Sequence, residues 1–174
     1  SSFNLRRALI DGSNSTVIIS DKNITGLTLD YANQHIYYIS EDVIYRVNYD
    51  GTMKYRILVT WRQKLQDVSS ISVFENYLYV TTVGENRQLF KVHRYDYSVI
   101  PTEIIRDLMW PHEIHIYHRQ RQPGLRGIKN PCEKSNCSKL CVIDWSGDQP
   151  AAKCLCPAGY KMDLSSQYQC ITNK

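Results

Sequence analysis

The feature that most constrains this chain is an internal repeat of about forty residues, which extends from the N-terminus to residue 118. Each copy begins with a tight turn followed by an aliphatic strand. Asp-Gly suits such a turn, because glycine tolerates positive φ and the aspartate side chain accepts hydrogen bonds from its own backbone. The copies are Asp11-Gly12-Ser13 before Val17-Ile18-Ile19, Asp50-Gly51-Thr52 before Ile57-Leu58-Val59, and Asp96-Tyr97-Ser98 before Ile104-Ile105. Three copies in one phase argue against coincidence.

Between these turns, apolar and polar residues alternate along short segments. The segments are Leu27–Tyr31, His35–Ser40 and Val43–Asn48 in one copy, Ile71–Phe74, Tyr77–Thr82 and Leu89–Arg94 in the next, and Ile114–Tyr117 in a partial third copy. Alternation over about five or six residues rich in Val, Ile, Tyr and Thr is typical of half-buried antiparallel strands. The sequence therefore predicts about four short strands in each repeat and almost no helix.

Four strands in about forty residues predict the blade of a β-propeller. One complete period runs from about Gly26 to Thr60 and another from about Ser69 to Arg106, with strand fragments on either side. A propeller needs roughly four to eight blades to close its ring. The predicted fold is therefore all-β and contains a partial propeller, whose remaining blades belong to a longer chain or are supplied elsewhere.

The cysteines define a second region. All six lie between Cys132 and Cys170, with the spacing C-x4-C-x3-C-x12-C-x-C-x13-C. Six cysteines in roughly 40 residues predict a small module that disulfides stabilise in an oxidising compartment. The sequence alone permits fifteen pairings. Structural zinc is disfavoured, because Cys154-Leu155-Cys156 spaces its thiols too closely for the usual zinc-ligand pairs.

The repeat resembles the six-bladed propellers of low-density-lipoprotein receptors and their relatives. Tyr37-Tyr38-Ile39-Ser40 and Tyr79-Val80-Thr81-Thr82 stand where that family carries its Tyr-Trp-Thr-Asp signature, and Leu9–Ser13 and Asn48–Thr52 resemble its Leu-Asp-Gly-Ser element. The segment from His115 to Pro123 resembles the one that closes such a propeller. The resemblance implies a six-bladed-type propeller. Ser40 and Thr82 replace the signature aspartate, so the ties that it makes between neighbouring blades are expected to be altered here.

The cysteine region resembles an EGF-like module, with Cys156-Pro157-Ala158-Gly159-Tyr160 as part of its pattern. That resemblance implies the pairs Cys132–Cys141, Cys137–Cys154 and Cys156–Cys170. Calcium-binding modules of this kind carry acidic residues just before the first cysteine, and here that place reads Gly127-Ile128-Lys129-Asn130-Pro131. We therefore expect no calcium in this module, and no metal or other cofactor in the chain. The predicted domains are a propeller segment over residues 1–126 and an EGF-like module over residues 127–174.

Charge and hydropathy exclude some partners. The net charge of +4 comes from basic residues that are spread along the chain rather than gathered in a stripe, so nucleic-acid binding is not indicated. No apolar run approaches the roughly 18–20 residues that span a bilayer, so a membrane anchor is expected outside this chain. The sequons at Asn14 and Asn23 are candidate glycosylation sites, and a third match at Asn136 is weaker because Cys137 follows it.

Histidines suggest one functional hypothesis. Imidazole titrates near pH 6.5, so it gains charge between the cell surface and an endosome. Lipoprotein-receptor propellers are implicated in acid-dependent ligand release, and this resemblance suggests His112, His115 or His118 as a pH switch; the alternative is that they are ordinary strand or surface residues. His112-Glu113-Ile114-His115 is not a metalloprotease motif, because its histidines are three rather than four residues apart.

The three tryptophans have different expected environments. Trp110 lies beside the expected closing strand, so we expect it in the core. Trp61 and Trp145 lie in loop-like surroundings, and for these two the sequence does not distinguish packing from surface exposure.

No nucleophile and base pair and no phosphate-binding loop is recognisable, so enzymatic activity is not expected. The resemblance implies an extracellular segment of an endocytic receptor at the cell surface that cycles through endosomes. Its implied partners are protein or lipoprotein ligands and other domains of the same receptor, with the propeller acting as a rigid architectural unit. Two alternatives remain open: a structural protein of the basement membrane similar to nidogen, and the ectodomain of a signalling co-receptor.

Overall fold

The computed structural model describes residues 2–57, 65–96, 98–121, 129–145 and 147–173. The chain forms two compact units, the first made of residues 1–6 and 17–123 and the second of residues 7–16 and 124–174. The predicted domain boundary at residues 126 and 127 lies outside the described residues, as does Trp61, so both expectations stay predictions.

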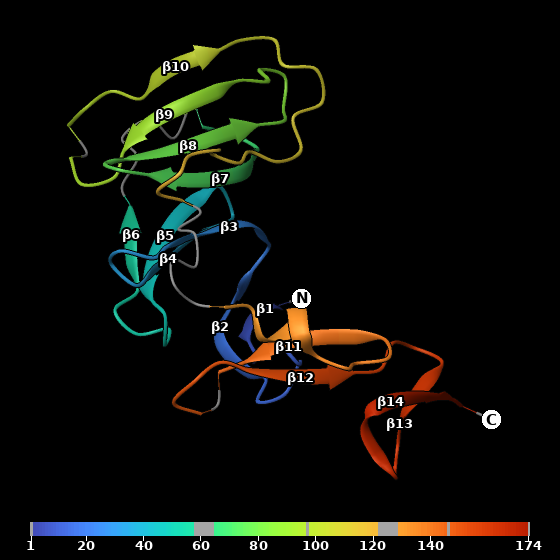
Figure 1. The fold of residues 1–174 in the computed structure, drawn as a ribbon. Coiled ribbons are helices and arrows are strands. Elements are labelled where there is room, and N and C mark those ends of the chain that lie inside the picture. Colours follow the sequence, from blue (N-terminus) through green and yellow to red (C-terminus); the bar gives the residue numbers. More distant parts are fainter. Residues whose placement is uncertain (1, 58–64, 97, 122–128, 146, 174) are drawn as a thin grey trace. The chain divides into compact units, whose positions relative to one another are not determined.

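The described residues are almost entirely β-structure (Figure 1). The strands of the first unit and its connection to the second are β1 (Ser2–Arg7), β2 (Thr16–Lys22), β3 (Ile24–Asp30), β4 (His35–Ser40), β5 (Val43–Asn48), β6 (Tyr55–Ile57), β7 (Val68–Phe74), β8 (Tyr77–Thr82), β9 (Leu89–His93) and β10 (Thr102–Ile105). The cysteine-rich region contains the 3-10 helix η1 (Pro131–Lys134) and the strands β11 (Leu140–Asp144), β12 (Ala151–Leu155), β13 (Tyr160–Asp163) and β14 (Ser166–Thr172).

Two four-stranded antiparallel sheets follow one another along the chain. The first has the order β3-β4-β5-β6 and is called blade 1, and the second has the order β7-β8-β9-β10 and is called blade 2. β1 and β2 pair with each other ahead of blade 1. Sequential strands are neighbours in both sheets, as in a propeller blade. The predicted fold class, a partial propeller of two blades with flanking strands, is confirmed.

The repeated aspartate turns share one hydrogen-bonding pattern. The Oδ1 atoms of Asp11, Asp50 and Asp96 each accept a hydrogen bond from the backbone N–H two residues later, at 2.9–3.0 Å. Gly51 has φ +85°, and a Cβ at this position would lie 2.4 Å from the carbonyl oxygen of Ile18. This turn therefore needs glycine both for its backbone conformation and for its close approach to β2.

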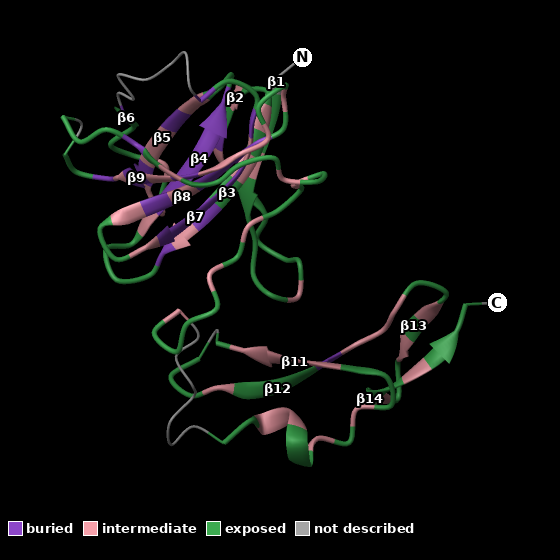
Figure 2. Cartoon of the chain, turned by 90° about the horizontal axis from the view of Figure 1, so that it is seen from above, coloured by how far each residue is buried: buried purple, intermediate pink, exposed green. Residues whose placement is uncertain are grey.

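The core of the first unit lies between the two blades (Figure 2). Alternation sends one face of β4 toward blade 2, where Tyr37 and Ile39 join the same cluster as Leu78 and Val80 of β8. The buried members are Tyr37, Ile39, Ile44, Ile57, Leu65, Val68, Ile71, Val73, Leu78, Val80, Phe90 and Val92. Burial of each large apolar side chain contributes about 1.5–3 kcal/mol, so this interface is the main source of stability for the stacked blades.

The opposite face of blade 1 packs against the β1–β2 pair. Ile36, Tyr38 and Val47 form a second buried cluster with Ile19 of β2. Tyr38 Oη also donates a hydrogen bond to Asp21 Oδ2 at 3.1 Å, and Lys54 Nζ donates to the same oxygen at 2.6 Å. β1 and β2 therefore cover blade 1 as the outer strands of a preceding blade would.

The expected change in the ties between blades is visible in the structure. Ser40 Oγ donates to the carbonyl oxygen of Lys22 in β2, whereas Thr82 Oγ1 donates to the backbone carbonyl oxygen of Asn86 within blade 2. A charged tie occurs elsewhere, where Arg94 after β9 pairs with Asp30 at the end of β3. Each side chain of this pair is 8% exposed. The blades are therefore joined by a buried ion pair that uses neither signature position.

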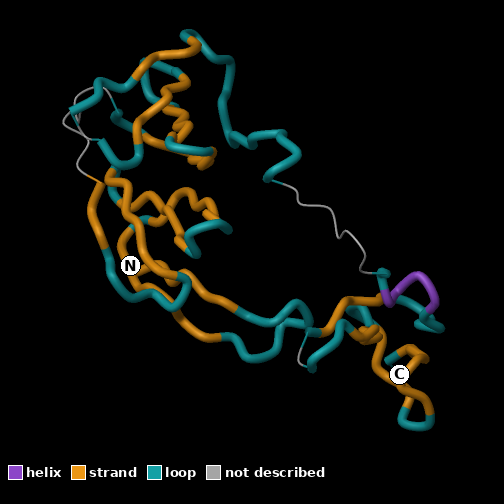
Figure 3. Tube along the Cα trace, turned by 60° about the vertical axis from the view of Figure 1, so that its left-hand side comes forward, coloured by secondary structure: helices purple, strands orange, loops and turns teal. Residues whose placement is uncertain are grey.

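The expected strand at Ile114–Tyr117 is not formed. Residues 111–118 carry no strand, and Figure 3 draws the path from β10 to Arg121 as loop. A strand is defined by a hydrogen-bonded neighbour, and the Ile114 N–H donates instead to the Ser70 side chain at 3.1 Å. The strand prediction is therefore wrong here, because among the described residues this segment has no strand partner.

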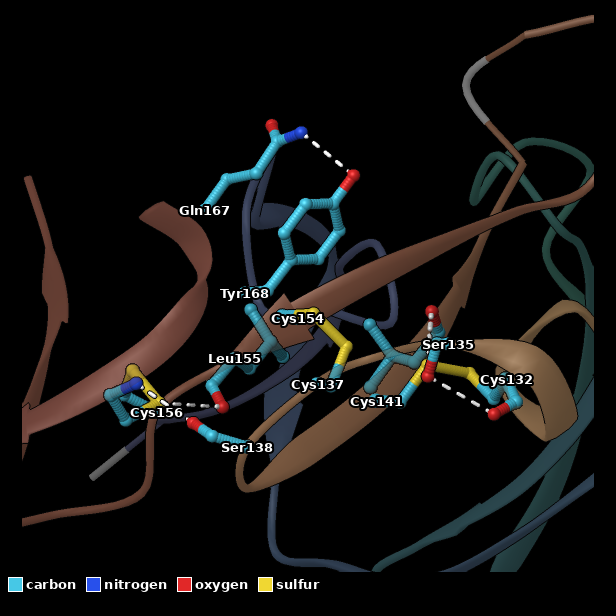
Figure 4. The surroundings of a disulfide bond; sticks show 12 residues. Cys132, Ser135, Cys137, Ser138, Cys141, Cys154, Leu155, Cys156, Gln167 and Tyr168 are labelled. Atoms are coloured by element: carbon cyan, nitrogen blue, oxygen red, sulfur yellow. Dashed lines mark hydrogen bonds between the residues drawn. A yellow bond between two sulfur atoms is a disulfide. The ribbon is translucent and has the colours of Figure 1, made fainter. Parts of the chain in front are cut away.

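The cysteine-rich module consists of two small hairpins, β11–β12 and β13–β14. Disulfide bonds join Cys132 to Cys141, Cys137 to Cys154 and Cys156 to Cys170, with Cα–Cα distances of 5.8, 5.3 and 5.7 Å (Figure 4). These are the pairs that the EGF-like resemblance implied. Ser138 Oγ accepts a hydrogen bond from the Cys170 N–H at 2.8 Å, which adds a polar link beside the bonded cysteines.

Candidate ligand-binding groove and its histidines

The inner strands of the two blades and the segment that follows blade 2 border a groove of ≈ 540 Å³. β3 and β7 are the edge strands of their sheets, and they lie side by side. Thr25 Oγ1 donates to the carbonyl oxygen of Val68 at 3.3 Å, and Thr28 Oγ1 accepts from the Val73 N–H at 3.4 Å. Side chains thus bridge two strand edges, and residues of both blades line the groove.

The segment from Trp110 to Arg121 forms one wall of this groove. Ile114 is held by Ser70, and the ring of His118 lies 4.6 Å from that of Phe74, centroid to centroid. At the end of the segment, Arg121 Nη1 donates to the carbonyl oxygen of Leu29 at 2.9 Å. Contacts to both blades therefore fix a segment that has no regular secondary structure.

The three histidines of the sequence hypothesis lie on this wall. His112 and His115 line the groove, and both are exposed. His115 Nε2 is 3.1 Å from Glu113 Oε2, so a protonated His115 would form an ion pair with that carboxylate. His118 is also exposed and rests on Phe74. The structure thus brings His112 and His115 to one concave surface, whereas His118 lies on the same segment but does not line the groove.

A smaller cavity of ≈ 200 Å³ lies where the ion pair joins the blades. Asp30, Arg94 and Arg121 line it together with Phe74. Burial alone would raise the pKa of Asp30, but hydrogen bonds from Asn33 and the charge of Arg94 lower it. Asp30 therefore stays ionised at neutral pH and keeps the buried guanidinium of Arg94 paired.

Sequence reasoning missed a further histidine, His35, at the start of β4. His35 is half-buried, and its Nδ1 has no hydrogen-bond partner in the described part of the chain. Burial lowers the pKa of His35, and the positive charge of Arg46 lowers it further. The signal available in the sequence was positional. His35 begins β4 at the position where Tyr77 begins β8, so an imidazole replaces a phenol ring.

The expected core position of Trp110 is wrong. Its side chain is 73% exposed, and the Arg87 guanidinium carbon lies 5.3 Å from the centroid of the indole. Trp110 has φ +54° in a bend after β10, so the chain turns there instead of entering a strand that would direct the ring into the core. Trp145, for which the sequence left both outcomes open, is 55% exposed.

Comparisons with known proteins agree with this architecture. The chain is 28% identical over 164 residues to the vitellogenin receptor Yl of Drosophila melanogaster, a match that covers 90% of the chain and 8% of the receptor. It is 28% identical over 141 residues to the vitellogenin receptor of Solenopsis invicta, which covers 78% of the chain and 7% of the receptor. No protein-family model matches. The chain thus spans less than a tenth of the length of these relatives.

A solved structure has a similar fold. A chain in the crystal structure of a nidogen/laminin complex superposes with a TM-score of 0.51 at 21% identity, over 60% of this chain and 40% of the solved chain. The two receptors and this neighbour support the resemblance to low-density-lipoprotein-receptor propellers followed by an EGF-like module. In the first unit, the groove lies along the inner strands and the segment that follows blade 2.

Within the ranges that the structure describes, no three His, Cys, Asp or Glu side chains gather in a way that could hold a metal ion. The described residues also contain no helix with the length and apolarity to cross a membrane. Both sequon asparagines, Asn14 and Asn23, are exposed and have positive φ, of 52° and 47°.

Proposed function

We propose that this chain is part of the cell-surface ectodomain of an endocytic receptor and that its propeller groove binds a protein or lipoprotein ligand. The observation that supports this most is the match to two vitellogenin receptors, which covers 90% of this chain in one case and 78% in the other. Both relatives are named for vitellogenin, which makes that lipoprotein the first ligand to test. The receptor would reach the membrane through a segment outside this chain and would cycle through endosomes. We propose no enzymatic activity for it.

The groove suits release of a ligand in an acidic compartment. His112 and His115 line it and are exposed, so a charge on either ring would face a bound ligand. Protonation would add positive charge beside Arg121, which already lies at the same groove. A ligand that presents a basic surface there would then be repelled at endosomal pH.

The experiment measures binding of vitellogenin to the purified ectodomain at about pH 7.4 and about pH 5.5. In the triple variant His112→Gln, His115→Gln and His118→Gln, the pH dependence of the dissociation constant is expected to fall by about tenfold, equivalent to about 1.4 kcal/mol of differential binding. Arg119→Gln is the matched control, because this exposed residue lies on the same segment. An unchanged ratio of dissociation constants in the triple variant would remove the histidines from the proposal.

We also propose N-glycosylation at Asn14 and Asn23. Exposure of both side chains and the position of each in a bend or between strands suit the attachment of a bulky glycan. Glycopeptide mass spectrometry of the secreted chain tests each site separately. An unmodified asparagine at either position would remove that site.

The matrix-protein alternative has one supporting observation, the shared fold with a chain of the nidogen/laminin complex. At 21% identity this likeness concerns the fold alone, so it does not favour a matrix role over a receptor. Retention of the protein at the surface of expressing cells after extraction of the matrix would favour the receptor, and recovery in the matrix fraction would favour the alternative.

A further inference from the structure

A cavity of ≈ 590 Å³ lies at one end of the blades and adjoins the ligand groove. Its walls come from the connection between β2 and β3, the turn between β4 and β5, the start of β7 and the segment after β10. The residues that matter here are Asn23, Asp42, Asp67, Val83, Trp110 and Pro111.

Trp110 is the main apolar surface of this cavity. At 73% exposure, its indole leaves a large aromatic area in contact with water, which is unfavourable unless something covers it. Arg87 lies over the ring at 5.3 Å from the centroid. The remaining open ring surface faces a cavity that it shares with Pro111 and Val83. The natural occupant is therefore a group with a flat apolar side.

The polar walls indicate what the rest of the occupant is. Asp42 and Asp67 contribute carboxylates to the cavity. Asp42 Oδ1 accepts one hydrogen bond, from the Val68 N–H at 3.1 Å, which leaves further lone pairs on the carboxylate for other donors. A pyranose ring matches both features, because its axial C–H groups form an apolar face and its hydroxyls donate hydrogen bonds. Carboxylates around an exposed indole are thus the chemistry of a saccharide site.

Asn23 also lines this cavity, so a glycan attached to its sequon would begin beside the indole. It is the single residue between β2 and β3, it is exposed, and Ile24 and Thr25 complete its sequon. We propose that the N-linked glycan on Asn23 folds back into this cavity and that its first sugars lie on the indole of Trp110. The glycan then covers the aromatic surface that the protein leaves open. This inference rests on the glycosylation of Asn23 proposed above, and it is independent of the proposed ligand.

The test uses the full chain secreted from a eukaryotic host. Glycopeptide mass spectrometry first gives the occupancy of Asn23 and Asn14. Acrylamide quenching of tryptophan fluorescence is then measured before and after a peptide-N-glycosidase removes the whole glycan, which converts the modified Asn23 to aspartate. The Trp110→Phe variant, measured in parallel, gives the part of the signal that belongs to Trp110.

We expect removal of the glycan to raise the quenching constant of Trp110 at least about twofold, because the covered ring face becomes open to the solvent. The Asn23→Asp variant, which never carries a glycan, should show the raised value from the start. Asn14→Gln should respond to the glycosidase as the wild type does, and Thr25→Ser, which preserves the sequon, should retain both the glycan and the protection.

Two results would overturn the inference. The first is an Asn23 that carries no glycan. The second is a glycosylated Asn23 at which removal of the glycan leaves the quenching of Trp110 unchanged. Neither result bears on vitellogenin binding or its pH dependence, which are measured separately. The failure of this inference and the failure of the proposed function are therefore distinguishable.

Discussion

The propeller segment and the EGF-like module stabilise β-structure in opposite ways. In the first unit, apolar side chains from two blades form a continuous buried cluster, and a buried ion pair joins the blades. In the module, Cys154 is the only buried residue among residues 129–145 and 147–173 (Figure 2). A segment without a core depends on covalent cross-links, whereas stacked blades depend on packing.

The difference follows from size and from how sheets meet. Each blade presents a face of four strands to its neighbour, so many side chains leave water at once. The two hairpins of the module are too small to bury such a face, and isolated two-stranded hairpins are marginal in water. The three disulfides replace that missing burial, each by about 2–4 kcal/mol through restriction of the unfolded chain.

Reduction of the disulfides should give the largest effect and should confine it to one region. We expect the module to lose its structure completely, because each native disulfide of a small secreted domain contributes roughly 2–5 kcal/mol. The blades should keep theirs, since all six cysteines lie outside the propeller segment. Hydrogen exchange of backbone amides under mild reduction measures both regions in one sample. Loss of protection in β4 and β8 at the same rate as in β11 and β12 would contradict the separation.

Removal of one partner of the buried ion pair should have the next largest effect. Asp30→Asn leaves Arg94 buried without its carboxylate, which costs about 3–5 kcal/mol. The double variant Asp30→Leu with Arg94→Met should recover much of that loss, because it removes both charges together. Unfolding by urea measures the change. Lys54→Gln, whose ion pair with Asp21 is partly exposed, is the control and should cost less than about 1 kcal/mol.

Acid should act on the same pair. The pKa of Asp30 is lowered in the folded state, so its contribution to stability is fully present above the ordinary value of 3.8 and is lost as the pH falls through the folded value. Wild-type protein should therefore show a stability loss below pH 3.8 that Asp30→Asn does not show. Equal acid slopes in the two proteins would mean that Asp30 is not the group responsible.

A matched pair of leucines tests the contrast in packing directly. Leu78 of β8 is fully buried between the blades, whereas Leu140 of β11 is 49% exposed. Leu78→Ala should cost about 3 kcal/mol of unfolding free energy, because it removes buried methyl groups and leaves a cavity. Leu140→Ala should change the stability of its module by less than about 0.5 kcal/mol. A large effect of Leu140→Ala would show that the module has a core after all.

Within the first unit, the sequence predicts some elements better than others. Strand alternation and aspartate turns indicate β3–β5 and β7–β9 because those signals are local, and Asp11, Asp50 and Asp96 form the expected turns. The segment Ile114–Tyr117 has the same local pattern, yet a strand also requires a neighbour that local sequence does not specify.

Site residues are harder to predict, because they depend on contacts between distant parts of the chain. The pair of Asp30 and Arg94 joins residues that are far apart in sequence and belong to different blades. Comparison of the two repeats offers one signal, because each charged residue aligns with an uncharged one. Arg94 aligns with Asn48 of the earlier repeat, and Asp30 aligns with Phe74 of the later repeat. Trp110 was placed in the core by its neighbourhood in sequence, but its backbone conformation directs it outward.

The smallest expected effect concerns His35, which begins β4 and does not line the groove. Its pKa is lowered in the folded state by burial and by Arg46, so the folded protein favours the neutral ring. As the pH falls below the ordinary value of 6.5, the unfolded chain gains a proton before the folded one does, and stability decreases until the folded ring is also protonated. His35→Gln should remove this part of the pH dependence below pH 6.5, as measured by urea unfolding. His115→Gln is the control, because that side chain is 83% exposed. If both variants retain the wild-type slope, His35 is not the group responsible for the pH dependence of stability in this range.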